Sequence, residues 1–149
     1  MAGSIGVRRR GRECALQVLY SLDLNASLST AQALAHYWRA FQHEAGDGEE
    51  KDPAIISFAE DLVNGATDNQ AEIDDIIQRA SKNWRLDRMA RVDRNLLRLA
   101  TYELRFHPDV PAKVVINEAI EVAKRYGTAE SPAFVNGLLD RISQELKRS

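Results

Sequence analysis

The sequence has one cysteine, four prolines and eight glycines among 149 residues, and it has no long hydrophobic run. The single cysteine, Cys14, cannot form an intramolecular disulfide, and no secretory signal opens the chain, so we expect a cytoplasmic protein. No apolar run approaches the roughly 18 residues that span a bilayer, so we expect no membrane association. With 44% hydrophobic and 28% charged residues, the composition is that of an ordered globular chain.

Sequence patterns for catalysis, cofactors and metals are missing as well. No GxGxxG or GxxxxGK phosphate loop occurs, and the three histidines form no HExxH pattern. His36 and His43 fall on one helical face, but isolated surface histidines are much commoner than a two-histidine metal site, and one cysteine cannot build a zinc cluster. Cys14 lies beside an apolar stripe and is expected to be a buried, inert thiol. We therefore predict a non-enzymatic protein with no cofactor and no metal.

Apolar residues recur at helical spacing along most of the chain, and no long stretch alternates with the period of a β-strand. We predict an all-α fold of about seven helices in a single domain over residues 1–149, with residues 1–8 as a flexible basic arm. The first expected helix runs from Arg9 to Leu24, and the second begins at Ser29 or Thr30 and ends at an acidic loop at 45–53. A third helix begins at Pro53, and a fourth runs from Asp68 or Asn69 to Ala80. The last three are a long helix from after Trp84 to Phe106, a helix from a cap at Asp109 to a left-handed Gly127, and a helix that begins at Ser131.

The net charge of −2 hides a strong asymmetry along the chain. The net charge is +3 in residues 1–42, −10 in residues 43–75 and +5 in residues 76–149. Basic ends with an acidic middle can present one face to a polyanion while another face repels it.

The strongest basic signal lies at the start of the first expected helix. Arg8, Arg9, Arg10 and Arg12 place four arginines within five positions. Arginine combines charge, bidentate phosphate binding and stacking on bases, so this cluster favours nucleic-acid binding. The alternatives are a solvated terminus or a targeting tract.

Helical spacing extends this cluster along the first helix. At 100° per residue, Arg9, Glu13, Gln17 and Tyr20 share one stripe, away from the apolar stripe that contains Val18. Tyr20 is then placed to stack on an unpaired base. The alternative is a tyrosine that lies half-buried over a neighbouring helix.

A second basic stripe occurs on the long central helix. Its members are Arg91, Arg94, Arg98 and Arg105, with Asp87 and Asp93 beside them. Mixed charge on one edge suits a protein partner as well as a nucleic acid, and an ordinary solvated helix face is the commoner explanation for any one of these residues.

Three segments together resemble one family: RRRGRECALQVLYSLD at 8–23, LRLATYEL at 97–104, and VPAKVVINEAIEVAKRYGTAESPAFVNGLLD at 110–140. They are similar to the NusB family of bacterial transcription antitermination factors, in the same order and spacing. The resemblance implies an all-helical fold of two small helical bundles packed across each other.

The function that the resemblance implies is binding of single-stranded boxA RNA together with ribosomal protein S10 (NusE). That complex joins the RNA polymerase elongation complex and promotes processive transcription of ribosomal RNA operons. The alternative is a helical RNA-binding or adaptor domain, like the N-terminal domain of ribosomal RNA cytosine methyltransferases, although a chain that ends at Ser149 is expected to have no room for a cofactor-binding domain. Whether the protein is a monomer or a homodimer stays open.

The resemblance also implies site residues. The RNA-binding positions carried over are Arg8, Arg9, Arg10, Arg12, Gln17, Tyr20, Tyr126, Phe134 and Asn136. Asp87 and Asp93 match acidic positions on the side that faces the protein partner. One departure from the pattern is Gly11, which costs about 0.5–1 kcal/mol of helix stability relative to alanine. We therefore expect the basic arm to fray in the absence of RNA.

Overall fold

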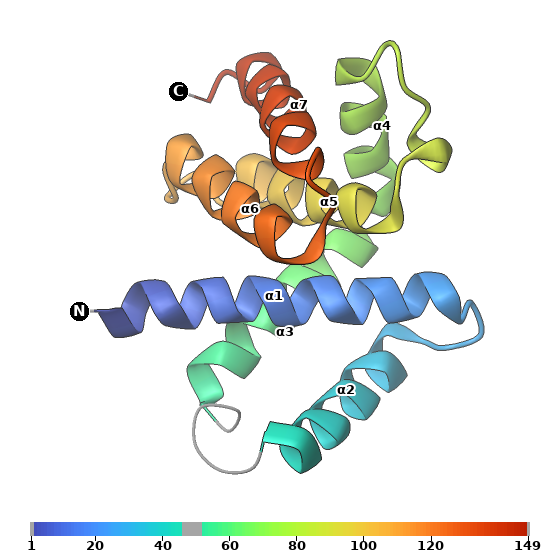
Figure 1. Ribbon diagram of the computed structural model, residues 1–149, viewed down its shortest axis with the longest axis vertical. Coiled ribbons are helices and arrows are strands. Elements are labelled where there is room, and N and C mark those ends of the chain that lie inside the picture. The colour runs from blue at the N-terminus through green and yellow to red at the C-terminus, as the bar shows by residue number, and fades with distance from the viewer. Residues whose placement is uncertain (1, 46–51, 149) are drawn as a thin grey trace. The chain divides into compact units, whose positions relative to one another are not determined.

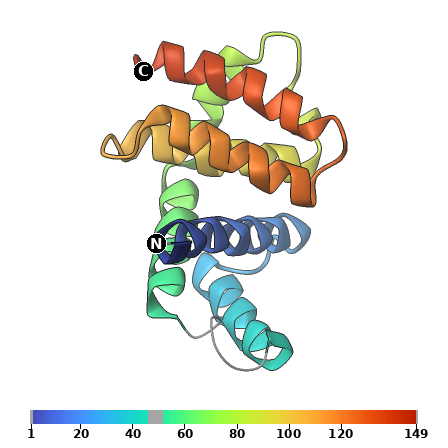
Figure 2. The ribbon, with the colours of Figure 1, turned by 60° about the vertical axis from the view of Figure 1, so that its left-hand side comes forward.

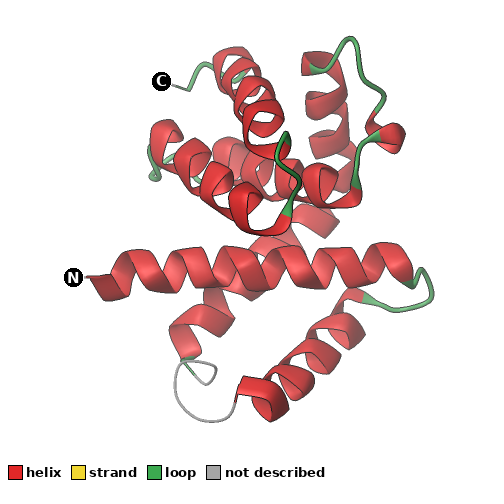
Figure 3. Ribbon diagram, viewed as in Figure 1, coloured by secondary structure: helices red, strands yellow, loops and turns green. Residues whose placement is uncertain are grey.

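The computed structural model describes the backbone of residues 2–45 and 52–148, and the side chains of residues 6–40 and 52–148. Within these residues the regular secondary structure is all helical, with seven α-helices and one short 3-10 helix joined by turns and loops (Figure 3), so the all-α prediction is confirmed. The elements are α1 (Ala2–Leu24), α2 (Thr30–Ala45), α3 (Pro53–Asp68), α4 (Gln70–Ala80), η2 (Leu86–Arg88), α5 (Arg91–Phe106), α6 (Ala112–Tyr126) and α7 (Ser131–Glu145). Most of the expected acidic loop at 45–53 lies outside the described residues.

The chain divides into two compact units, residues 1–67 and residues 68–149. Unit 1 contains α1, α2 and nearly all of α3, and unit 2 contains α4 to α7. Among the helices that the structure describes, none combines the length and the hydropathy needed to span a lipid bilayer.

Unit 1 is organised around α1, whose residues from Gly11 to Leu16 are all buried. Ser29, one of the two predicted caps, starts α2. It forms a capping box with Gln32, because the backbone N–H of Gln32 donates to Ser29 Oγ at 3.1 Å and the backbone N–H of Ser29 donates to Gln32 Oε1 at 2.9 Å. Cys14 is fully buried against Ile55 and Ala59 of α3, which confirms that it is a core thiol.

The first helix begins earlier than the sequence predicts. It starts at Ala2 rather than Arg9, so residues 2–8, expected as a flexible arm, are helical in the structure. The physical reason is that Val7 packs against the cluster of Cys14, Ile55 and Ala59, which gives this part of the helix an apolar anchor that periodicity alone does not reveal. Whether this segment frays in solution stays a prediction.

Unit 2 is organised around α5, which lies against α4, α6 and α7 (Figures 1 and 2). Two arginines of the predicted basic stripe are used in this packing. The guanidinium of Arg98 donates to both carboxylate oxygens of Asp74 on α4, at 2.8 and 3.0 Å, and Arg105 Nε donates to Glu72 Oε2 at 2.9 Å. At these two positions the basic stripe therefore holds helices together.

The long helix predicted from after Trp84 begins only at Arg91. The preceding segment is held in another conformation by Gln78, whose side-chain amide donates to the carbonyl of Trp84 and accepts from the backbone N–H of Leu86, each at 2.9 Å. The hydroxyl of Ser81 also donates to the Trp84 carbonyl at 2.9 Å. Because side chains satisfy these backbone groups, the segment does not need helical hydrogen bonds.

The turn between α6 and α7 also differs from expectation. Gly127 has φ −96° and ψ −166°, which is extended backbone rather than the predicted left-handed conformation. A Cβ at residue 127 would collide with the side chain of Ser131. The hydroxyl of Ser131 accepts from the backbone N–H of Thr128 at 3.0 Å, so the glycine leaves room for the side chain that closes this turn.

Candidate nucleic-acid interface

The four arginines of α1 do not share one environment. Arg8 is exposed, Arg9 and Arg10 are half-buried, and Arg12 is only 4% exposed. Positions 8 and 12 lie one turn apart on the same face of the helix, and this face is directed toward α3. Of the four predicted phosphate contacts, Arg8 is therefore the most accessible and Arg12 the least.

Arg8 and Arg12 both contact the aromatic ring of Phe58 on α3. Their guanidinium carbons lie 5.9 and 5.2 Å from the ring centroid, within the range of a cation–π interaction. This contact holds Arg12 within unit 1, while Arg8, the more distant of the two, stays exposed. Helical periodicity does not predict this contact, because it places Phe58 among the apolar core residues of the third helix.

Arg10 is held by an acidic neighbour on its own helix. Its Nη1 donates to Glu13 Oε1 at 3.1 Å, and Glu13 is only 4% exposed. Burial alone would lower the pKa of Arg10, but the electrostatic influence of Cys14, the hydrogen bond to Glu13 and the electrostatic influence of Tyr37 together raise it above its usual value. Arg10 thus keeps its charge, but part of that charge is already compensated.

The polar stripe predicted on α1 is only partly confirmed. Glu13 is buried rather than solvated, because the middle of α1 is enclosed on most sides. Gln17 is half-buried and accepts a hydrogen bond from the Tyr37 hydroxyl at 3.0 Å. Tyr20 is 38% exposed, so part of its ring is open to solvent, as base stacking requires.

In unit 2 the three predicted RNA-binding residues lie near the α6–α7 turn. Tyr126 is half-buried on the last turn of α6, with the Arg125 guanidinium 5.5 Å from its ring centroid. Phe134 and Asn136 lie on α7, and Asn136 is exposed. Of the three, only Phe134 lines the pocket described next.

The two predicted partner-binding residues differ from each other. Asp87 lies in η2, with an exposed carboxylate that accepts from Arg85 at 2.9 Å. Asp93 lies in the first turn of α5 and lines a pocket of about 380 Å³ together with Phe134. The structure thus brings one predicted partner residue and one predicted RNA residue into the same pocket.

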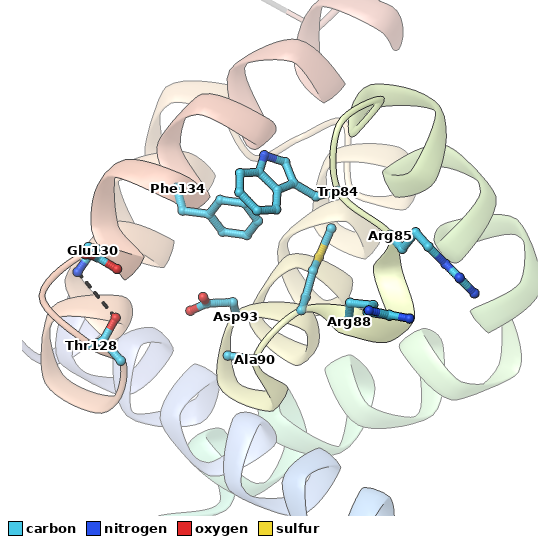
Figure 4. Close-up of a pocket in the computed structure, with 9 residues that line it drawn as sticks. Trp84, Arg85, Arg88, Ala90, Asp93, Thr128, Glu130 and Phe134 are labelled. Carbon is cyan, nitrogen blue, oxygen red and sulfur yellow. Dashed lines mark hydrogen bonds between the residues drawn. The ribbon is translucent and has the colours of Figure 1, made fainter.

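Sequence reasoning missed the residue that dominates this pocket. Trp84 lines it, is 61% exposed, and contacts Phe134 edge to face with the ring centroids 6.2 Å apart (Figure 4). A signal was present in the sequence, because Trp84 lies in the polar stretch SKNWRLDR and belongs to no apolar stripe. A large aromatic residue in such a context is a candidate for binding.

Comparison with known proteins shows what the chain resembles. The NusB family model matches residues 9–144. The transcription antitermination protein NusB of Myxococcus xanthus is 51% identical over 144 residues, which cover 97% of this chain and 99% of that protein.

Solved structures agree with this result. A NusB structure from T. maritima has a TM-score of 0.80 at 41% identity and covers 93% of this chain and 91% of that one. A chain from the crystal structure of the antitermination factors NusB and NusE in complex with dsRNA has a TM-score of 0.77 at 27% identity, with 93% of this chain and 97% of that one covered. The chain therefore belongs to the NusB family.

Proposed function

We propose that this protein is a transcription antitermination factor that binds single-stranded boxA RNA together with NusE. The observation that carries the proposal is the family match over residues 9–144, which includes nearly all of the arginine cluster, Tyr20 and Phe134. The M. xanthus relative is named as an antitermination protein, and one similar solved structure contains NusE and RNA. The role is binding rather than catalysis, and it is exercised in the cytoplasm.

Within unit 1, we assign RNA binding first to Arg8 and Arg9, which are the outer members of the arginine cluster. Their guanidinium groups neutralise phosphates and release counterions, which makes the affinity depend on salt. The open part of the Tyr20 ring supplies a stacking surface for an unpaired base. Arg10 and Arg12 act indirectly, because their contacts with Glu13 and Phe58 position this part of α1.

Within unit 2, Tyr126, Phe134 and Asn136 provide further RNA contacts. For NusE, we assign Asp87, because its carboxylate is exposed and can reach a basic partner. Asp93 was predicted alongside it, but its surroundings differ because it lines the pocket of unit 2. The complex of RNA, NusE and this protein then joins RNA polymerase and suppresses termination during ribosomal RNA synthesis.

The proposal is tested by transcription in a reconstituted reaction with RNA polymerase and NusE. The template carries boxA upstream of a terminator, and the control template carries the same bases in scrambled order. We expect the protein to increase read-through on the boxA template only. Equal read-through on both templates would contradict the proposed function.

A further inference from the structure

The pocket of unit 2 combines aromatic walls with two acidic residues, Asp93 and Glu130. It opens where the segment after α4, the start of α5 and the start of α7 meet. Trp84 and Phe134 form one wall, and Asp93 lies across from them (Figure 4). Its volume of about 380 Å³ lies in the range typical of small-molecule sites.

The aromatic wall is fixed in place before any ligand binds. The carbonyl of Trp84 accepts hydrogen bonds from Gln78 and Ser81, each at 2.9 Å, so its backbone is held while its indole stays 61% exposed. The edge-to-face contact with Phe134 orients the two rings at 89°. A rigid, exposed indole is a stacking surface that loses little conformational entropy on binding.

The carboxylate across the pocket lacks a donor. Asp93 Oδ1 is buried and has no hydrogen-bond partner among the residues that the structure describes. An unmet buried acceptor is unfavourable, and a ligand that brings N–H groups would satisfy it. Asp93 lies in the first turn of α5, at the end of a helix where acidic side chains are favoured.

The charges around the pocket suit a nucleotide. Arg85 is already paired with Asp87 and points away from the two aromatic rings (Figure 4). Arg88 also lines the pocket, is exposed, and forms no ion pair within the described part of the chain. The aromatic wall suits the face of a base, and the carboxylate suits the N–H groups on the edge of that base. The guanidinium of Arg88 at the rim suits a phosphate.

We propose that this pocket receives one unstacked guanine base of the bound RNA. Guanine presents two adjacent donors, N1–H and the N2 amino group, to the Asp93 carboxylate. The base stacks on the Trp84 indole and meets the Phe134 ring, which stands at 89° to the indole, with its edge. Cytosine and adenine place an acceptor nitrogen beside their amino group, and uracil has one N–H between two carbonyls, so each of these bases sets an acceptor against the acceptor-only carboxylate. The proposal rests on the proposed RNA-binding function and moves Asp93 from the protein partner to the RNA.

The test replaces the guanosines of a boxA-containing RNA one at a time by inosine, which lacks only the N2 amino group. Affinity is measured by fluorescence anisotropy with the full chain. We expect one position at which inosine weakens binding about tenfold, because it loses one hydrogen bond to the charged carboxylate. In Asp93→Asn this difference between guanosine and inosine disappears, and in Trp84→Ala the affinity for all the RNAs falls about tenfold.

The matched control is Asp75→Asn, which removes an exposed carboxylate on α4 that does not line the pocket. It leaves the ratio of guanosine to inosine affinity unchanged. Urea unfolding of Asp93→Asn verifies that the variant is folded.

The outcomes separate this proposal from the one on which it rests. If boxA is preferred over scrambled RNA but no position distinguishes guanosine from inosine, the RNA-binding function stands and the guanine pocket is wrong. If Asp93→Asn keeps the guanosine preference and weakens NusE binding, the pocket is a protein-docking site and the proposal is overturned. If the wild-type protein prefers no RNA, both proposals fail.

Discussion

Gly11 of α1 lies so close to Phe58 of α3 that a Cβ on residue 11 would stand 2.6 Å from Phe58 Cδ2. The guanidinium groups of Arg8 and Arg12 make cation–π contacts with the same ring. The glycine that interrupts the arginine cluster, and that costs helix stability when considered alone, is thus the residue that lets α1 approach α3. The position of the arginines depends on this close approach.

We predict that Gly11→Ala destabilises the protein by about 1–3 kcal/mol, as overpacking usually does. Alanine has the higher helix propensity by roughly 0.5–1 kcal/mol, but its Cβ would force the ring of Phe58, which also contacts two arginines, to shift. Urea unfolding followed by circular dichroism measures the change.

The matched control is Gly137→Ala on α7, where an added Cβ meets nothing within 4 Å. This variant is expected to be more stable than the wild type by about 0.4–1 kcal/mol. If both alanine variants gain stability, the close contact between Gly11 and Phe58 is not important.

The arginines of α1 are predicted to separate into two classes. Arg8→Ala combined with Arg9→Ala flattens the slope of log K against log salt by about 1.4, because each lost phosphate contact removes about 0.7. Arg12→Ala leaves that slope nearly unchanged and lowers the free energy of unfolding by about 1 kcal/mol or more, since a buried side chain and its ring contact are lost. Salt titrations of RNA binding distinguish the two classes. If only Arg12→Ala flattens the slope, Arg12 rather than Arg8 and Arg9 contacts the phosphates.

Two neighbouring acids on α4 provide a test of the packing in unit 2. Asp74→Ala removes two of the acceptors of the half-buried Arg98 guanidinium, which also donates to Asn95 Oδ1, and is expected to cost about 1.5–3 kcal/mol. Asp75→Ala removes an exposed ion pair with Arg79 on the same helix and should change stability by less than about 0.5 kcal/mol. Equal effects in thermal or urea unfolding would show that the Arg98–Asp74 contact is no stronger than a surface pair.

The start of α1 is predicted to fray in the free protein, although it is helical in the structure. Val7 is its only apolar anchor among residues 6–10, and continuous burial begins at Gly11. Amide hydrogen exchange should therefore be fast up to about Arg8, slow from Cys14 onward, and slower for the first segment once RNA binds. Full protection from Arg8 onward without RNA would refute this prediction.

The fold could be predicted largely because helical signals are local. The Ser29–Gln32 capping box and the apolar period of each helix are contained in short stretches, and the structure shows both. Gly127 was identified as a turn residue, but the reason was wrong. Its role depends on the side chain of Ser131 rather than on its own backbone angles.

The candidate site was harder to predict because it depends on contacts between helices. Helical periodicity placed Arg12 with the other arginines, and nothing in its own helix shows that Phe58 covers it. Trp84 was missed because a residue outside an apolar stripe does not contribute to a periodic pattern. Its position became clear only with the hydrogen bonds that hold the segment before α5.

The central claim is that this protein recognises boxA RNA and does so better with NusE. Fluorescence anisotropy of labelled boxA RNA and of a scrambled RNA, each titrated with the protein at two salt concentrations, with and without NusE, tests it most directly. The account predicts tighter binding to boxA than to the scrambled RNA, a preference that increases with NusE, and weaker binding at higher salt. Equal affinity for both RNAs, unchanged by NusE, would contradict it.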